Sequence, residues 1–290
     1  MAEVRNGART IDARIQRSAI EDGRAEVGAS EPGLMWRVRR VVSRVVKSIS
    51  RWWRSRTATK ALLLAGVAAA GVYVVGDVVS GLLYKIDRPY SFKDQWISEL
   101  TALGSPVRPL MVAVMTVHGL LVAAFAVGIW RAARQNRTLR WAGLVLLATA
   151  AAGLVIHPVF PMSSRWMEAS FTDTMHGITS MVWGVVISVG VALASVAYRG
   201  WFRVYSIVTL VVLIGFAVAS SMAIEGIEQN DTPWAGGFER ISAYALMAWF
   251  VVLAVTVTRR SRSDATPEKH VTDVPQTRVQ TREPSLAARS

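Results

Sequence analysis

The 290-residue sequence contains no cysteine. Disulfide bonds, thiolate metal sites and a cysteine nucleophile are therefore excluded. Charge is also scarce, because Asp, Glu, Lys and Arg together make up 18% of the residues, whereas soluble domains carry about a quarter. Apolar residues account for 52% and gather in long uninterrupted segments. A soluble enzyme is therefore excluded as a function class.

Six apolar segments are each long enough to cross a hydrocarbon layer about 30 Å thick. They are continuous rather than alternating, so in lipid they form helices and not barrel strands. We therefore predict an all-α, polytopic membrane protein with a six-helix transmembrane domain over residues 59–260. The first apolar segment begins near residue 61, so we expect no cleavable signal peptide. The predicted spans are 61–84, 109–130, 141–160, 176–198, 204–223 and 238–258.

The positive charge is unevenly placed along the chain. Of the 33 Lys and Arg residues, 27 lie in the terminal regions and in the connections near 131–140 and 199–203, and six lie in the other connections. Cytoplasmic loops are enriched in Lys and Arg, so both termini are predicted to be cytoplasmic. Arg outnumbers Lys by 28 to 5, a bias typical of GC-rich bacterial genomes. We expect the bacterial cytoplasmic membrane as the location.

Residues 34–58 form a basic segment directly before the first span. Apolar and cationic residues both recur there at steps of three and four, on opposite sides of a helical wheel. This pattern predicts an amphipathic helix on the cytoplasmic leaflet, in contact with anionic lipids. A docking helix or a basic nucleic-acid patch is the alternative, but fusion to a span favours the membrane, and we expect no nucleic-acid partner. The membrane-surface candidates are Arg37, Arg40, Arg44, Lys47, Arg51, Arg54, Trp52 and Trp53. The flanking segments 1–33 and 261–290 are predicted to be disordered.

Ionisable residues inside a membrane are costly and are the first candidates for function. Here they gather in the outer halves of the spans and in the outer connections, as a polar pocket open to the extracytoplasmic side would require. The ligand-binding candidates are Asp77, Glu99, His118, His157, Asp173, His176, Glu239 and Arg240.

Three interpretations of this set remain open. First, His118, His157 and His176 could bind zinc, with Asp77 or Glu239 as the acid or base of a metal-dependent hydrolase or transferase. Second, the set could bind a lipid head group or small ligand without chemistry. Third, it could form interhelical hydrogen bonds and a buried ion pair, Asp77 or Glu239 with Arg240 or a histidine.

The outer connection 85–108 carries its own pattern. Trp96, Ile97, Leu100 and Leu103 share one side of a helical wheel, and Gly104 and Pro106 follow as a helix stop. We predict a short amphipathic helix on the outer surface, capping the bundle.

The run Ser98-Glu99-Leu100-Thr101-Ala102-Leu103-Gly104-Ser105-Pro106 resembles a signature of a bacterial family catalogued as domain of unknown function 998. Phe160-Pro161, His176-Gly177, Phe202-Arg203-x-Tyr205-Ser206 and Gly237-Phe238-Glu239-Arg240 are similar to further motifs of that family. The resemblance covers residues 60–260 and implies a six-helix membrane protein without an established reaction. At Met162 the chain departs from the acid or hydroxyl that usually follows the Phe-Pro pair.

We therefore expect a non-catalytic membrane protein with an outward-facing polar pocket for a lipid or small ligand, acting as an accessory subunit of a cell-envelope complex. The metal-dependent hydrolase or transferase is the alternative. A transporter is third, because no internal repeat is evident and the inner halves of the spans carry no acid or histidine.

Overall fold

The structure is a computed structural model that describes residues 34–85, 89–165, 167–168, 170–226 and 231–263. The predicted disorder of residues 1–33 and of residues after 263 lies outside the described residues. The chain divides into two compact units, Met1–Ala61 and Leu62–Ser290. The first unit contains helix α2, Leu34–Arg54, at the position of the predicted basic helix. Its placement at a membrane surface stays a prediction, and the side chains of Arg37 and Arg54 are not described.

The second unit is built from six long helices, of which the first, α3, begins before the unit boundary. All six are long and apolar enough to cross a membrane, so the predicted all-α, six-span architecture is confirmed. The described residues contain two isolated β-bridges and no strand. The helices are α3 (Arg56–Leu83), α4 (Arg108–Ala132), α5 (Arg137–Val159), α6 (Phe171–Ala197), α7 (Trp201–Met222) and α8 (Ala235–Ser263).

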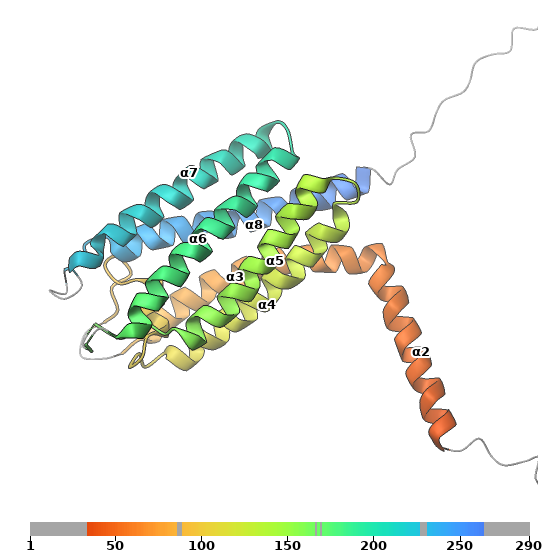
Figure 1. Cartoon of the computed structure of the whole chain (residues 1–290), viewed down its shortest axis with the longest axis horizontal. Helices are drawn as coiled ribbons and strands as arrows, with labels where there is room; N and C mark the ends of the chain where they lie inside the picture. The colour runs from red at the N-terminus through yellow and green to blue at the C-terminus, as the bar shows by residue number, and fades with distance from the viewer. Residues whose placement is uncertain (1–33, 86–88, 166, 169, 227–230, 264–290) are drawn as a thin grey trace, which may run out of the picture. The chain divides into compact units, whose positions relative to one another are not determined.

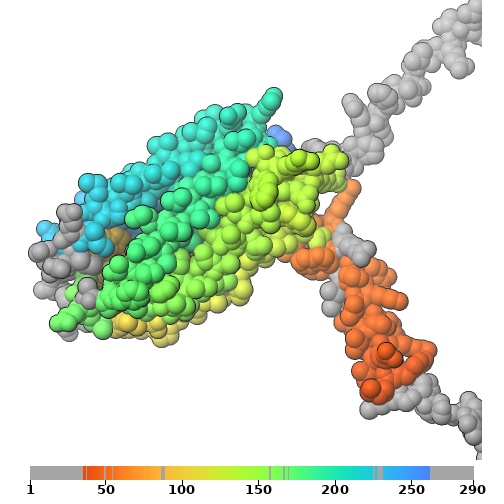
Figure 2. Space-filling view, in the orientation of Figure 1, coloured from red at the N-terminus to blue at the C-terminus, as the bar shows by residue number. Residues whose placement is uncertain are grey.

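Helices that follow one another in sequence pack side by side from α4 to α8, and α8 also packs against α4. Figure 1 shows the described residues of the three longer connections, which lie between α3 and α4, between α5 and α6 and between α7 and α8, at one end of these helices, which we call the loop end. The short turns 133–136 and 198–200 lie at the other end, the arginine end. Side chains of α5, α6 and α7 form one continuous face in the space-filling view (Figure 2).

Apolar side chains occupy both the interior and the outside of the bundle. Inside, the Phe125 ring meets the Phe250 ring edge-on at 5.7 Å between centroids, among buried residues such as Leu146 and Ile187. Outside, valines and leucines are exposed along every span, including Val75 on α3 and Val185 on α6. In water such a surface would be unfavourable, whereas in a bilayer it is matched by the lipid chains.

Helix α3 approaches α4 closely at three glycines, because a glycine has no side chain that would hold the two helices apart. A Cβ atom added to Gly76 would lie 2.2 Å from Cγ1 of Val114. Gly66 is pressed against the Phe125 ring, and Gly128 against Leu62. Small residues at such positions let membrane helices pack by van der Waals contact.

The contact at Gly76 predicts the effect of one methyl group. Gly76→Ala should lower the free energy of unfolding by about 1–3 kcal/mol, because the overpacked site must shift α3 or Val114. Adding Val114→Ala should recover part of the loss. Thermal denaturation of the detergent-purified protein measures both. Gly215→Ala on α7 is the matched control, because nothing lies within 4 Å of its added Cβ; an equal loss in both single variants would contradict the packing argument.

Candidate functional site

In the segment 84–107, which joins α3 to α4, the described residues 89–107 fold inward at the loop end. Its apolar side chains Tyr90, Trp96 and Ile97 are all buried, and Leu100 is completely so. The predicted short helix is a single 3-10 turn, Ile97–Thr101, and it is buried rather than on the outer surface. The spacing of the apolar residues predicted that this helix has an apolar side. Spacing does not show which part of the protein covers that side.

A buried ion pair joins α3 to α8 beneath this segment. The Arg240 guanidinium donates from Nε to Oδ2 of Asp77 at 2.9 Å and from Nη2 to Oδ1 at 2.8 Å. The Tyr244 hydroxyl donates a further hydrogen bond to Oδ2 at 2.6 Å. Asp77 has no exposed surface. Two parallel N–H bonds to one carboxylate are the strongest ion-pair geometry in proteins, and the pair is one that the third interpretation named.

The remaining donors of Arg240 bind the 84–107 segment. Nη1 donates to the backbone carbonyls of Phe92 at 2.8 Å and Gln95 at 3.0 Å, and Nη2 donates to the Tyr90 hydroxyl at 2.7 Å. That hydroxyl in turn donates to the Trp96 carbonyl at 2.6 Å. Burial raises the pKa of Tyr90 well above its usual value, so the phenol stays protonated and able to donate. One guanidinium therefore attaches both α3 and the segment to α8.

A second buried ion pair attaches the same segment to the α5–α6 connection. Arg165 donates from Nε and Nη2 to the two carboxylate oxygens of Glu99, each at 2.7 Å. The two side chains are 3% and 4% exposed. Arg165 also donates to the Asp94 carbonyl at 2.9 Å, and the Trp96 backbone N–H donates to Glu99 at 2.9 Å. Glu99 was a ligand-binding candidate from sequence, whereas its partner Arg165 was not identified.

The number of cations at the loop end was a sequence signal for this partner. Only six Lys and Arg residues occupy the connections and helix ends predicted to be outside, and two of them, Arg165 and Arg240, form the buried pairs. A Lys or Arg in connections that otherwise contain few cations is a candidate counter-ion for a buried acid. Tyr90 and Tyr244 had no comparable signal, because a single tyrosine near a helix end is ordinary in membrane proteins.

Two other acids stabilise turns at the same end. Asp173, in the first turn of α6, accepts hydrogen bonds from the backbone N–H groups of Ser163 and Ser170 at 2.5 and 2.7 Å, a helix-capping arrangement. Asp94 accepts from the Trp234 N–H at 3.1 Å. Burial alone would raise the pKa of Asp94, but this bond, the Ser91 hydroxyl and the Lys93 charge outweigh it and lower the pKa.

Glu239 has no cationic partner among the described residues. It lies in the first turns of α8, next to Arg240, and one carboxylate oxygen accepts a hydrogen bond from the Ile97 backbone N–H. The other oxygen has no hydrogen bond to any described residue. Glu239 is half-buried, and unlike Asp77 and Glu99 it forms no ion pair with a described residue.

The histidines are held by backbone carbonyls. Nδ1 of His118 bonds the Ala69 carbonyl at 3.0 Å, and Nδ1 of His176 bonds the Phe160 carbonyl at 2.8 Å. The side chain of His157 lies outside the described residues. Within the described part of the chain, no three His, Asp or Glu residues come together as a possible metal site. The zinc hypothesis therefore stays a prediction, with no described triad to support it.

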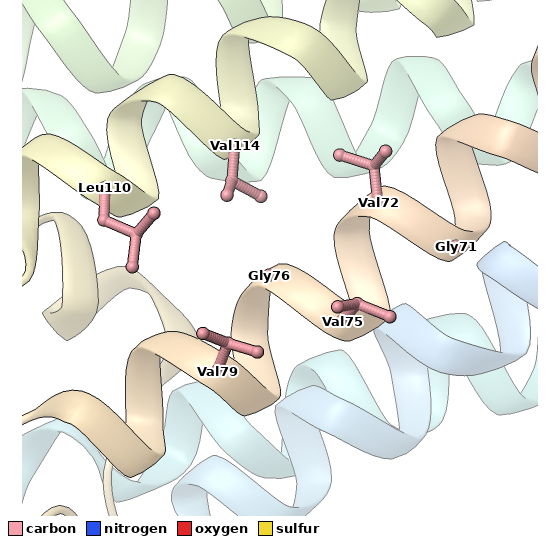
Figure 3. A pocket seen from close by; sticks show the side chains of 7 residues that line it. All are labelled: Gly71, Val72, Val75, Gly76, Val79, Leu110 and Val114. Carbon is pink, nitrogen blue, oxygen red and sulfur yellow. The ribbon is translucent and has the colours of Figure 1, made fainter.

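A groove lies between α3 and α4 in the half of the spans nearer the loop end. Figure 3 shows its lining side chains, all apolar, around a volume of about 430 Å³. On α3 the lining consists of glycine and valine, and α4 adds one leucine and one valine. The residues are Gly71, Val72, Val75, Gly76, Val79, Leu110 and Val114.

These features define an all-helical, multi-pass integral membrane protein whose loop end is closed by two buried ion pairs. The chain belongs to the family described as protein of unknown function (DUF998), whose model matches residues 38–256, and the expected family is confirmed. No curated protein and no solved structure matches the chain.

The Asp77–Arg240 pair predicts strongly non-additive mutations. Arg240→Met should lower the free energy of unfolding by about 3–5 kcal/mol, because it leaves the Asp77 carboxylate buried without a cation. Asp77→Leu combined with Arg240→Met should cost less than Arg240→Met alone, since both charges are then removed. Chemical unfolding of the purified protein measures the cycle.

Lys93→Met provides the control for that cycle. Lys93 is paired with Asp94 at 3.5 Å but is 53% exposed on its side chain, so its loss should change stability by about 0–1 kcal/mol. Additive losses for Asp77 and Arg240 would show that the two side chains do not depend on each other.

Proposed function

We propose that this protein is a non-catalytic integral membrane protein that binds a membrane lipid in the groove between α3 and α4. The observation that carries the proposal is the groove itself, which is bounded only by apolar atoms of two membrane-spanning helices. Small-molecule sites typically enclose about 300–1,000 Å³, and this groove falls in that range. A lipid acyl chain lies at this depth in a bilayer and needs no polar partner, so it is the ligand that fits the groove.

The engagement of the charged side chains supports a non-catalytic role. A catalytic acid or base must reach the substrate within hydrogen-bond distance. The charged atoms of four candidates instead bind partners within the protein. These candidates are Asp77, Arg240, Glu99 and Asp173. Each of these four side chains thus has a structural role, which supports a binding rather than a catalytic function.

Gly71 is the position at which the groove is open. Nothing lies within 4 Å of a Cβ atom added there, in contrast to Gly76 five residues further along α3. A larger residue at 71 therefore enters the groove without clashing with α4. This makes Gly71 a position where groove occupancy can be changed without disturbing the helix contact.

Gly71→Leu should lower lipid retention by at least tenfold. The introduced side chain displaces acyl-chain contacts, and about two methylene groups, at about 0.8 kcal/mol each, account for that factor. Native mass spectrometry of the detergent-purified protein counts the retained lipids. Gly215→Leu is the control, since position 215 also faces open space but lies on α7. Equal retention in both variants, or none in the unaltered protein, would refute the groove as the lipid site.

We also propose that the protein lies in the cell membrane with both termini cytoplasmic and with α2 on the inner leaflet. The charge asymmetry supports this, because the loop end carries few cations and the arginine end many. The loop end then faces outward. An accessory role in a cell-envelope complex, expected from the sequence, is part of the same proposal.

Cysteine labelling tests the orientation, because the chain has no native cysteine. Gln135→Cys in the α4–α5 turn and Glu168→Cys in the α5–α6 connection both place a thiol at an exposed position. In intact cells an impermeant thiol reagent should modify position 168 at least tenfold more than position 135, and lysis should equalise the two. Labelling of position 135 from outside would invert the proposed topology.

A further inference from the structure

We propose that the arginine end of the six-helix bundle binds the phosphate group of an anionic phospholipid. The site consists of exposed arginines on the turns between helices and on the adjoining ends of α5, α7 and α8, which we call the arginine patch. These are Arg134, Arg137, Arg140, Arg199, Arg203 and Arg260. The groove of Figure 3 lies in the other half of the spans. The proposal therefore depends neither on the groove nor on which side of the membrane the arginine end faces.

Two contacts bring three separate parts of the chain together at this end. Asn136, in the α4–α5 turn, donates from Nδ2 to the carbonyl of Ala197, the last residue of α6, at 3.2 Å. The Arg260 guanidinium, near the end of α8, lies 4.6 Å from the centroid of the Tyr198 ring. The residue that follows Asn136 and the residue that follows Tyr198 are both arginines of the patch. Cations from α5, from the α6–α7 turn and from α8 therefore gather at one place.

The arginine patch has no acid beside it in the described part of the chain. The described aspartates and glutamates all lie at the loop end or in the loop-end half of a span. These are Asp77, Asp94, Glu99, Glu168, Asp173, Glu225, Asp231 and Glu239. None of the six patch guanidiniums forms a hydrogen bond or an ion pair with a described residue. Their N–H donors are thus available to an anion from outside the protein.

Aromatic rings rather than carboxylates hold two of these guanidiniums. The Arg140 guanidinium lies 5.1 Å from the centroid of the Trp130 ring, and Arg260 lies over Tyr198. The face of an aromatic ring attracts a cation without neutralising its charge. The two guanidiniums are therefore positioned and still able to bind a phosphate through two parallel N–H bonds.

Exposed tryptophans place the patch at the depth of the lipid head groups. Trp130, Trp141 and Trp201 are 42%, 61% and 66% exposed, and each lies at the arginine end of a membrane span. Tryptophan is enriched where a membrane meets water, because its ring is apolar and its N–H is polar. Arg140 directly precedes Trp141, and Arg203 lies two residues after Trp201. These guanidiniums therefore reach the level of the lipid phosphates.

The same surroundings favour a lipid over a nucleic acid, the other common partner of clustered arginines. The exposed tryptophans continue into the apolar outer surface of the spans, where Leu144 and Val204 are exposed about one turn further in. That surface contacts acyl chains in a bilayer. A phosphate that lies beside the arginines and next to acyl chains belongs to a phospholipid.

Phosphatidylglycerol is the probe, and phosphatidylcholine is its neutral counterpart, because choline offsets the phosphate charge. Native mass spectrometry of the full-length protein from micelles with equal amounts of both lipids measures the ratio in which they are retained. We expect the unaltered protein to retain more phosphatidylglycerol. High salt should reduce this preference, because it screens interactions between charges at a surface.

Arg137→Gln combined with Arg199→Gln should lower that ratio about tenfold or more, since each cation near anionic lipid strengthens the association about fivefold. Both side chains are exposed, so the fold should be unaffected. Lys85→Gln combined with Lys93→Gln is the matched control, because it removes two exposed cations at the loop end. It should change the ratio by less than about threefold. Helix α2 is the same in both variants, so lipid that it binds does not affect the comparison.

Gln135→Glu decides the matter if the arginine variant fails to fold. It places an anion at an exposed position of the α4–α5 turn, next to the patch, and should lower the ratio about threefold to tenfold. The proposal fails if the unaltered protein shows no preference for phosphatidylglycerol, or if the loop-end control loses as much preference as the arginine variant. It also fails if Gln135→Glu and the arginine variant both retain the lipids as the unaltered protein does. Binding of a single-stranded oligonucleotide without any lipid preference, lost in the arginine variant, would assign the patch to a nucleic acid instead.

Discussion

The loop end of this protein depends on the bidentate contact between Arg240 and Asp77. Each group alone would be strongly unfavourable between apolar helices, and together they form a neutral pair with nearly every hydrogen-bonding position used. The guanidinium has five donors in one plane, so after binding Asp77 it still reaches Phe92, Gln95 and Tyr90. Three elements distant in sequence, α3, α8 and the 84–107 segment, are thereby held by one side chain.

Glu99 and Arg165 form a second buried pair of the same bidentate geometry at the loop end. There the acid belongs to the 84–107 segment and the cation to the α5–α6 connection. Two ion pairs that cross between different elements select one arrangement of the loops over others of similar hydrophobicity, because a misplaced loop would leave a buried charge alone. The loop end is therefore shaped by polar pairing, while the arginine-end half is packed by Phe125, Phe250 and their apolar neighbours.

Two features of the bundle, Glu239 and the groove between α3 and α4, take no part in these ion pairs. Glu239 accepts a hydrogen bond from the Ile97 N–H and forms no ion pair with a described residue. The groove between α3 and α4 has the opposite character, with no polar lining. The apolar groove is thus distinct from the polar pairs that close the loop end.

The sequence by itself determined the six membrane helices, because an apolar segment of about 20 residues has no other stable form in a bilayer. It also marked Asp77, Glu239 and Arg240 as unusual, since charge inside a span is costly wherever it occurs. Which acid paired with Arg240 was decided only by the tertiary structure, because Asp77 and Glu239 both carry a carboxylate and the pairing depends on how α3 packs against α8. The burial of Ile97–Thr101, the role of Arg165 and the groove opened by Gly71 were decided there too. Each arises where residues far apart in the chain meet, and local spacing carries no information about that meeting.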